Sequence, residues 1–224
     1  MTFLDRRDAG ERLARRLLAY RRERPVVVAL PRGGVAVASE VAKELGAPLD
    51  VLVVRKVGVP FEPELAMGAV AEGMPPVVVR NEAVLLHARV SEAQFQDALA
   101  LATRELIRRK HLFRGDREPL NIEGRTVLLV DDGIATGATV RAAIEALRRR
   151  RPKSLVLAVP IAPTDVVDEL RPLVDAVVCL DERAYLGVIG HHYADFRPVT
   201  EEDVVRALLR DATGRESFTQ RVIS

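Results

Sequence analysis

The chain has 224 residues, 48% of them hydrophobic, and its 34 basic and 32 acidic residues leave a formal net charge of +2. This size fits one globular domain, and the near balance of charge argues against nucleic acid, so the expected partner is a small anion. No apolar run approaches the roughly 18 residues that cross a bilayer, and the charged N-terminus lacks the apolar core of a signal peptide, so we expect no membrane association.

Two helices and a strand are predicted in the first 45 residues. Leucines recur at helical spacing between about residues 5 and 20, which predicts a surface helix with one buried stripe. Residues 26–30 are all apolar and predict a buried strand, followed by the turn Pro31–Gly34 and a helix over about 35–45. The tandem glycines of the turn let backbone N–H groups converge on an anion, and Arg32 adds a forked cation suited to phosphate.

A second buried strand is predicted over residues 51–54, ending at Arg55 and Lys56. Parallel strands that alternate with helices end at the same sheet edge, so Lys56 is expected beside Arg32 and Asp131 in the crevice where such sheets bind ligands. A lysine that merely ends a strand in solvent is the alternative, and both interpretations stay open.

The middle of the chain predicts a hairpin and a long helix. Residues 57–79 contain no lysine or arginine and are rich in glycine and proline, which indicates a loop leading into a hairpin over about 67–79. A helix is expected over about 91–114, with Ser91 and Gln94 forming its capped start.

The stretch Val127–Thr139 organises the rest of the sequence. Four apolar residues predict a strand buried on both faces, and Asp131 and Asp132 follow where it ends. Glycines and small residues then open a helix, so backbone N–H groups, threonine hydroxyls and the helix dipole converge on one spot that suits a phosphate. Carboxylates do not bind phosphate; they suit neighbouring sugar hydroxyls or a hydrated magnesium ion.

Alternating strands and helices continue after this stretch. Strands are predicted over residues 155–159 and 176–180, with a helix between them that Thr164 caps and that reaches about Leu170. The second strand contains Cys179, the single cysteine, which excludes an internal disulfide and favours a reducing cytoplasm. A last helix is expected from Thr200 to about Leu209, with a loosely held tail past Asp211.

The run Val127–Thr139 resembles the phosphoribosyl pyrophosphate (PRPP) motif of type I phosphoribosyltransferases. The resemblance implies a Rossmann-like α/β fold: a central, mostly parallel sheet flanked by helices, with a β-hairpin and helical insertion and a small C-terminal hood. It implies one domain over residues 1–224, with a core at about 5–180, a hood at about 181–210 plus the N-terminal helix, and a tail at 211–224. The implied sugar and 5′-phosphate site consists of Asp131, Asp132, Gly133, Ala135, Thr136, Gly137, Ala138 and Thr139.

The resemblance also implies a reaction, in which a nitrogen nucleophile displaces pyrophosphate from magnesium-bound PRPP. Family members bind the pyrophosphate with the loop after the first core strand, often across a cis peptide, here Pro31–Arg32. The implied pyrophosphate residues are Arg32, Gly33, Gly34 and Lys56, and magnesium is held through PRPP with Asp131 and Asp132. Relatives close a mobile loop over the site near residues 57–79. In it Glu62 or Glu64 is a candidate base or metal ligand, although glutamates in such a loop are more often simply solvated.

The acceptor is not identified by the sequence. In purine-specific relatives a hood with aromatic residues covers the base, which makes Tyr193, Asp195 and Phe196 candidates, although Tyr193 and Phe196 suit packing equally well. Asp195 lies one position further from Gly190 than in those enzymes, which argues against a purine. Relatives that use 6-oxopurines carry an acidic residue where this chain has Ala135, which argues against hypoxanthine and guanine. A nucleobase or other small nitrogenous acceptor stays open, as does a homo-oligomer.

Two other functions fit parts of the same pattern. A response-regulator receiver also begins with a strand and two aspartates, but it needs a later lysine to hold its phosphoryl group, and no lysine follows Lys153. A regulator of the same fold could bind PRPP as an effector and control nucleic acid without turnover. The nearly neutral charge argues against that regulator without excluding it.

Overall fold

Parallel strands form the centre of the structure, a computed structural model that describes residues 2–211. Their order in the sheet is β2-β1-β6-β7-β8, and every neighbouring pair is parallel. The predicted strands at 26–30, 127–130, 155–159 and 176–180 are therefore confirmed, although the last two run further than expected. The bounds are β1 Val26–Ala29, β2 Leu49–Val51, β6 Thr126–Val130, β7 Ser154–Pro163 and β8 Ala176–Arg183.

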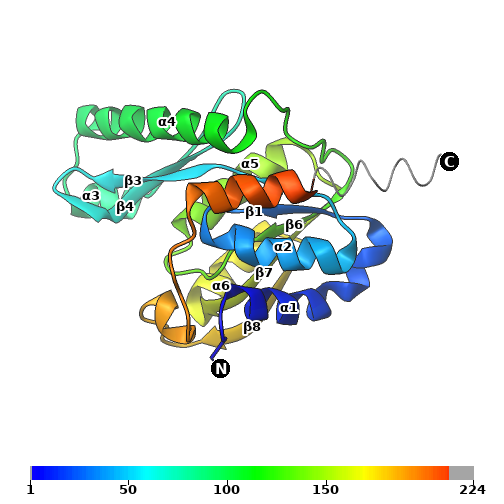
Figure 1. Cartoon of the computed structure of the whole chain (residues 1–224). Coiled ribbons are helices and arrows are strands. Elements are labelled where there is room, and N and C mark those ends of the chain that lie inside the picture. Colours follow the sequence, from blue (N-terminus) through cyan, green and yellow to red (C-terminus); the bar gives the residue numbers. More distant parts are fainter. Residues whose placement is uncertain (1, 212–224) are drawn as a thin grey trace.

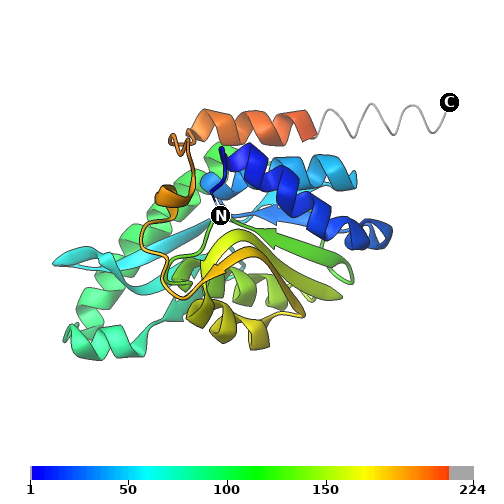
Figure 2. The same ribbon diagram turned by 90° about the horizontal axis from the view of Figure 1, so that it is seen from below.

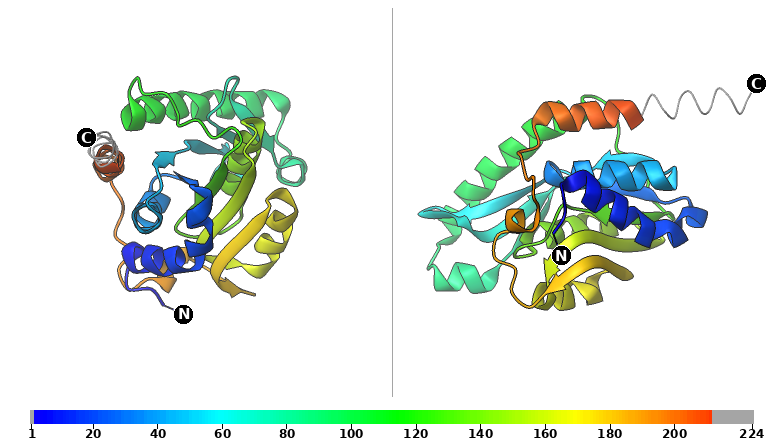
Figure 3. Two further views of the ribbon diagram at one scale, coloured as in Figure 1. Left: turned by 90° about the vertical axis from the view of Figure 1, so that its right-hand side faces the viewer. Right: turned by 60° about the horizontal axis from the view of Figure 1, so that its bottom comes forward.

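Helices cover both faces of this sheet, as Figure 3 shows from the side. On one face lie α1 (Arg6–Leu17) and α2 (Gly33–Leu45), and on the other lie α5 (Ala138–Arg149) and α6 (Thr164–Leu170). Strand β6 serves both cores, since Leu128 packs with α1 and α2 whereas Leu129 packs with α5. A strand buried on both faces has no polar alternation, which is why its sequence is an unbroken apolar run.

The predicted strand over residues 51–54 is wrong. Strand β2 ends at Val51, Leu52 and Val53 form a link, and a separate antiparallel sheet begins with β3 (Val54–Val59). Leu52 and Val53 are as deeply buried as their neighbours Val51 and Val54, so the apolar pattern gives no sign of the break. Lys56 consequently lies within a hairpin strand and does not end a parallel one.

The second sheet has the order β3-β4-β5, with β4 at Glu62–Ala71 and β5 at Val77–Arg80. The hairpin predicted over 67–79 is confirmed, but it is preceded by a further strand where a loop was expected. Helices α3 (Glu82–His87) and α4 (Glu92–Arg114) follow, and α4 lies over β3 and β4 (Figure 1). The capping box of Ser91 and Gln94 is present at the start of α4.

Residues near the N-terminus meet the segment around Tyr193 beside the sheet. Residue Phe3 forms an isolated parallel bridge with Tyr193, which directly follows the short helix η3 (Ile189–His192). A helix over residues 201–211 begins at the predicted Thr200–Asp203 cap and lies beside α2 (Figures 1 and 2). The predicted tail past residue 211 lies outside the described residues.

Shorter features complete the chain. The first helix ends earlier than expected and continues as the 3-10 turn η1 (Leu18–Glu23), and η2 (Arg171–Leu173) follows α6. Thr164 is the first residue of α6 and not its cap, because Pro163 precedes it in extended conformation and occupies the cap position. Across residues 2–211, no helix has the length and apolar character that spanning a bilayer would take.

Candidate functional site

The acidic pair stands at the carboxyl edge of the central sheet, directly after β6. The turn that follows β1 packs against it: a Cβ atom placed on Gly34 would lie 2.9 Å from the Cα atom of Asp131. The peptide bond between Pro31 and Arg32 is cis, as predicted. The two acids and the glycine turn, which are about a hundred residues apart in sequence, therefore form one continuous surface.

The two acids differ in their surroundings. The amide of Asp132 donates to Oδ1 of Asp131 at 2.8 Å. Desolvation, and then the neighbouring charge of Asp132, raises the pKa of Asp131 well above its usual value. Asp132 faces a cation that the sequence analysis missed, since Nε of Arg6 lies 2.6 Å from its Oδ2.

A loop and a helix N-terminus lie beside the acids. Gly137 has φ +73°, a left-handed conformation that glycine adopts freely, and it turns the chain into α5. Ala135 and Thr136 are exposed in this loop, and the first-turn N–H groups of α5 have no acceptor within the helix. The loop has the form of an anion cradle.

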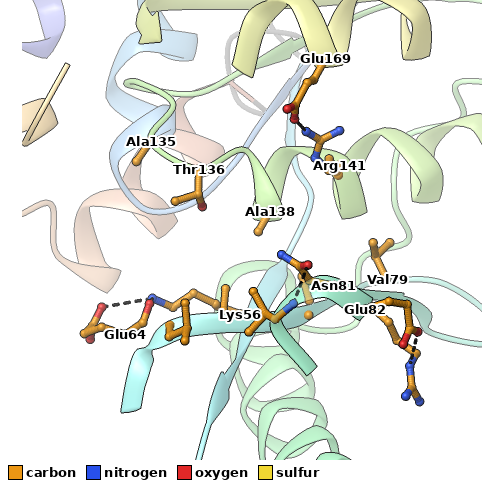
Figure 4. Close-up of a pocket in the computed structure, with 16 residues that line it drawn as sticks. Lys56, Glu64, Val79, Asn81, Glu82, Ala135, Thr136, Ala138, Arg141 and Glu169 are labelled. Atoms are coloured by element: carbon orange, nitrogen blue, oxygen red, sulfur yellow. Dashed lines mark hydrogen bonds and ion pairs between the residues drawn. The ribbon is translucent and has the colours of Figure 1, made fainter. Parts of the chain in front are cut away.

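A cavity of about 880 Å³ separates this loop from the β3-β4-β5 sheet. Thr136 and Ala138 line one wall and Lys56 the other, as Figure 4 shows. Nζ of Lys56 donates to the backbone oxygen of Glu64 at 2.9 Å and to its carboxylate at 3.1 Å. Lys56 and the loop before α5 thus share a cavity although Lys56 lies on an unexpected element. Glu64 is exposed but lines the same cavity, whereas Glu62 is exposed on the same hairpin and is not among the lining residues.

Arg55 is a second cation that sequence reasoning did not select. Its neighbours include Arg109 and Arg32, and desolvation followed by Arg109 lowers its pKa. Nε of Arg55 is buried without a hydrogen-bond partner among the described residues. A partly buried guanidinium close to Arg32 with an unused donor is suited to an anion. The sequence around Arg55 gives no sign of this role, because its apolar pattern predicts a parallel strand and Arg55 lies in the antiparallel sheet.

The three acceptor candidates do not form an open stacking surface. Tyr193 is 5% exposed, its ring lies between those of Phe3 and Phe196, and its hydroxyl donates to the backbone oxygen of Asp132 at 2.5 Å. Burial, and then the charge of Asp132, raises the pKa of Tyr193. The ring of Phe196 stacks against the guanidinium of Arg6. Asp195 forms an ion pair with Arg197 at 2.6 Å.

The donor set for a metal is small. Among residues 2–211 no three or more histidine, cysteine, aspartate or glutamate side chains gather as a metal site. The carboxylates of Asp131 and Asp132 are hard oxygen donors side by side, which fits a magnesium ion that takes most of its ligands from a phosphorylated substrate and water.

A family model and a curated relative both match this chain along most of its length. The family model described as "Phosphoribosyl transferase domain" matches residues 4–193. A Mycobacterium tuberculosis (strain H37Rv) protein provisionally described as a phosphoribosyl transferase is 46% identical over 208 residues, 93% of this chain and 46% of that protein. The match covers nearly all of this chain but only about half the length of these curated relatives.

Two further similarities concern a solved structure and a shorter segment. The crystal structure of the protein TT1426 from Thermus thermophilus superposes with a TM-score of 0.79 at 42% identity, covering 94% of this chain and 99% of that one. A Geobacter protein named bifunctional protein PyrR is 52% identical over 52 residues, 22% of this chain and 29% of its own.

Proposed function

This chain belongs to the phosphoribosyltransferase family, and we propose that it transfers the phosphoribosyl group of PRPP to a nitrogen nucleophile. The bond from C1 of the ribose to the pyrophosphate oxygen breaks, and a bond from C1 to the nitrogen forms. One observation carries the proposal: the acidic pair, the glycine turn and the loop before α5 meet at one sheet edge, so that hydroxyl acceptors and two anion cradles adjoin.

The sugar half of the site would consist of the acids and the loop. Asp131 and Asp132 would accept hydrogen bonds from the ribose 2′- and 3′-hydroxyls. The amides of residues 135–139 and the hydroxyls of Thr136 and Thr139 would hold the 5′-phosphate at the start of α5. With both ends of the sugar held, C1 is fixed relative to the nucleophile.

The leaving group needs positive charge, because its displacement leaves negative charge on pyrophosphate and positive charge on the sugar. The turn at Arg32, Gly33 and Gly34 supplies backbone N–H groups and one guanidinium, and Arg55 and Lys56 supply cations from β3. Magnesium, held by the acids together with PRPP, would neutralise part of the pyrophosphate charge. The hairpin residues 57–79 add no cation, so these three side chains carry that task.

The nucleophile would enter from the side of residues 184–197. These residues are one part of the hood expected at about 181–210, and we call them the hood segment. Ala135, in the position before the Thr136–Gly137 step, disfavours 6-oxopurines, and a nucleobase or another small nitrogenous compound is the proposed acceptor. Glu62 and Glu64 stay candidates for a base, although the contact of Glu64 with Lys56 supports a role in holding that lysine.

The proposal is tested by calorimetric titration with PRPP, with and without magnesium, on wild type, Asp132→Asn and Asp168→Asn. Asp168 is an exposed acid on α6, so its variant removes the same charge away from the site. We expect magnesium-dependent binding that Asp132→Asn weakens at least tenfold, about 1.4 kcal/mol, and that Asp168→Asn leaves unchanged. Equal affinity in the three proteins would remove Asp132 from the sugar site.

A panel of purine and pyrimidine bases, followed by pyrophosphate release, then identifies the acceptor. The second candidate function is a regulator that binds PRPP and nucleic acid. The short segment shared with the PyrR protein is the reason to test it. PRPP binding without pyrophosphate release for any base, together with RNA or DNA binding at moderate salt, would favour the regulator over the enzyme.

A further inference from the structure

Arg6, on the N-terminal helix α1, contacts the acidic pair and the hood segment at the same time. Its Nε lies 2.6 Å from Oδ2 of Asp132, and its Nη1 donates to the backbone oxygen of Arg197 at 2.9 Å. The centre of its guanidinium lies 3.7 Å from the ring centroid of Phe196. The fork is therefore held on three sides, by an acid after β6, by a backbone carbonyl and by an aromatic ring of the hood segment.

The same carboxylate is the one that a ribose hydroxyl would need. The side chains of Arg6 and Asp132 are only 11% and 14% exposed, so little of either carboxylate or guanidinium is available while the pair is intact. The glycine turn packs against the same carboxylate, since a Cβ atom placed on Gly33 would lie 1.9 Å from Oδ2, and Tyr193 bonds the backbone oxygen of Asp132. A sugar hydroxyl that binds Oδ2 therefore competes with Arg6 for this oxygen.

We propose that Arg6 is a built-in competitor of the sugar, which occupies Asp132 in the free protein and must be displaced when PRPP binds. The inference rests on the proposed function, since it takes PRPP as the ligand of Asp132. Displacement frees Arg6 from Arg197 and Phe196 as well, so sugar binding also releases the contact between the N-terminal helix and the hood segment. Affinity for PRPP is then set partly by how firmly the hood segment holds Arg6.

The test compares PRPP affinity, in the presence of magnesium, between wild type, Arg6→Gln and Arg7→Gln. Arg7 is the neighbouring residue on α1 and is exposed, pairing with Glu11 and Glu40, so its variant removes the same charge without touching Asp132. We expect Arg6→Gln to bind PRPP about fivefold more tightly than Arg7→Gln, because the charge-assisted bond to Asp132 no longer has to be broken.

A cycle with Asp132 separates competition from a general effect on structure. In an Asp132→Asn background the Arg6→Gln change should alter the PRPP affinity by less than about twofold, since the carboxylate that Arg6 competes for is gone. Phe196→Leu provides an independent variant if Arg6→Gln folds poorly. It leaves Arg6 and Asp132 in place but removes the ring under the guanidinium, and it should tighten PRPP binding in the same direction.

The outcomes are distinguishable. If wild type binds PRPP but Arg6→Gln and Arg7→Gln have equal affinities, the competition is wrong and the proposed function stands. If Arg6→Gln binds more weakly than Arg7→Gln, Arg6 is a ligand-binding residue and the competition is again wrong. If none of the folded proteins binds PRPP, the sugar site itself is wrong and the competition is wrong with it.

Discussion

A Cβ atom placed on Gly33 would lie 1.9 Å from Oδ2 of Asp132, so the turn after β1 touches the acid after β6 with no space between them. Gly33→Ala should push the Asp132 side chain aside and weaken PRPP binding at least tenfold, about 1.4 kcal/mol, while the fold survives. Gly34→Ala is the contrasting variant, because its Cβ would meet backbone atoms of Val130 and Asp131 at 2.9 Å. It should lower the unfolding temperature, which calorimetry measures together with affinity. Normal PRPP affinity in folded Gly33→Ala would contradict this contact.

The raised pKa of Asp131 predicts a pH-dependent stability. The folded protein holds the proton of Asp131 more tightly than the unfolded chain, so stability falls as the pH rises from about 4 through the folded pKa. Asp131→Asn removes this loss. We expect its unfolding temperature to match wild type near pH 4 and to exceed it by roughly 2–4 °C at pH 7, equivalent to about 1 kcal/mol. A temperature difference that stays constant between these pH values would contradict the prediction.

A buried charge cluster under α4 predicts a large loss of stability on mutation. Arg114 is 5% exposed and contacts Glu72 and Asp50, the latter at 3.1 Å. Arg114→Met would leave two buried carboxylates without their cation and should cost about 3–5 kcal/mol in the free energy of unfolding by urea. Arg108→Met on the same helix is the control, since Arg108 is half exposed and its ion pairs are on the surface. Equal losses in both variants would show that burial does not set the cost.

The contact between Lys56 and Glu64 separates two roles for the hairpin. If Lys56 binds pyrophosphate, Lys56→Ala should weaken pyrophosphate binding roughly tenfold, whereas Glu64→Gln should leave it unchanged or tighter because the lysine is freed. If Glu64 were instead the catalytic base, Glu64→Gln would lower kcat by about a hundredfold or more with little change in KM. Steady-state kinetics with the acceptor found in the base panel distinguish the two.

The parts of the site that are contiguous in sequence could be predicted from it. The strand, acids, glycines and helix of Val127–Thr139 follow one another, and the local pattern predicts their order. The Pro31–Gly34 turn was found for the same reason. Both stretches contain their own turn residues, so their local structure could be predicted without knowledge of the tertiary packing.

The contacts that join distant segments could not be predicted. Arg6 and Asp132 are 126 positions apart, and an arginine on an amphipathic surface helix gives no sign of pairing with an acid in the sheet. The strand carrying Lys56 was misplaced because burial continues through the break between β2 and β3, so hydrophobic pattern could not tell a link from a strand. The aromatic ring of Tyr193 likewise suits base stacking as well as packing. Only the structure shows that the ring packs between Phe3 and Phe196.

The bridge between Phe3 and Tyr193 sets an order in which the site can assemble during synthesis. Three backbone hydrogen bonds tie residues 3 and 4 to residues 192–195, so residues 3 and 4 reach their folded positions only after residues 192–195 have been synthesised. Until then Tyr193 and the hood contacts of Arg6 are missing at Asp132, even though the sheet that carries Asp132 can already assemble. Nascent chains halted before residue 190 would thus expose the carboxylate of Asp132 more than the folded protein does.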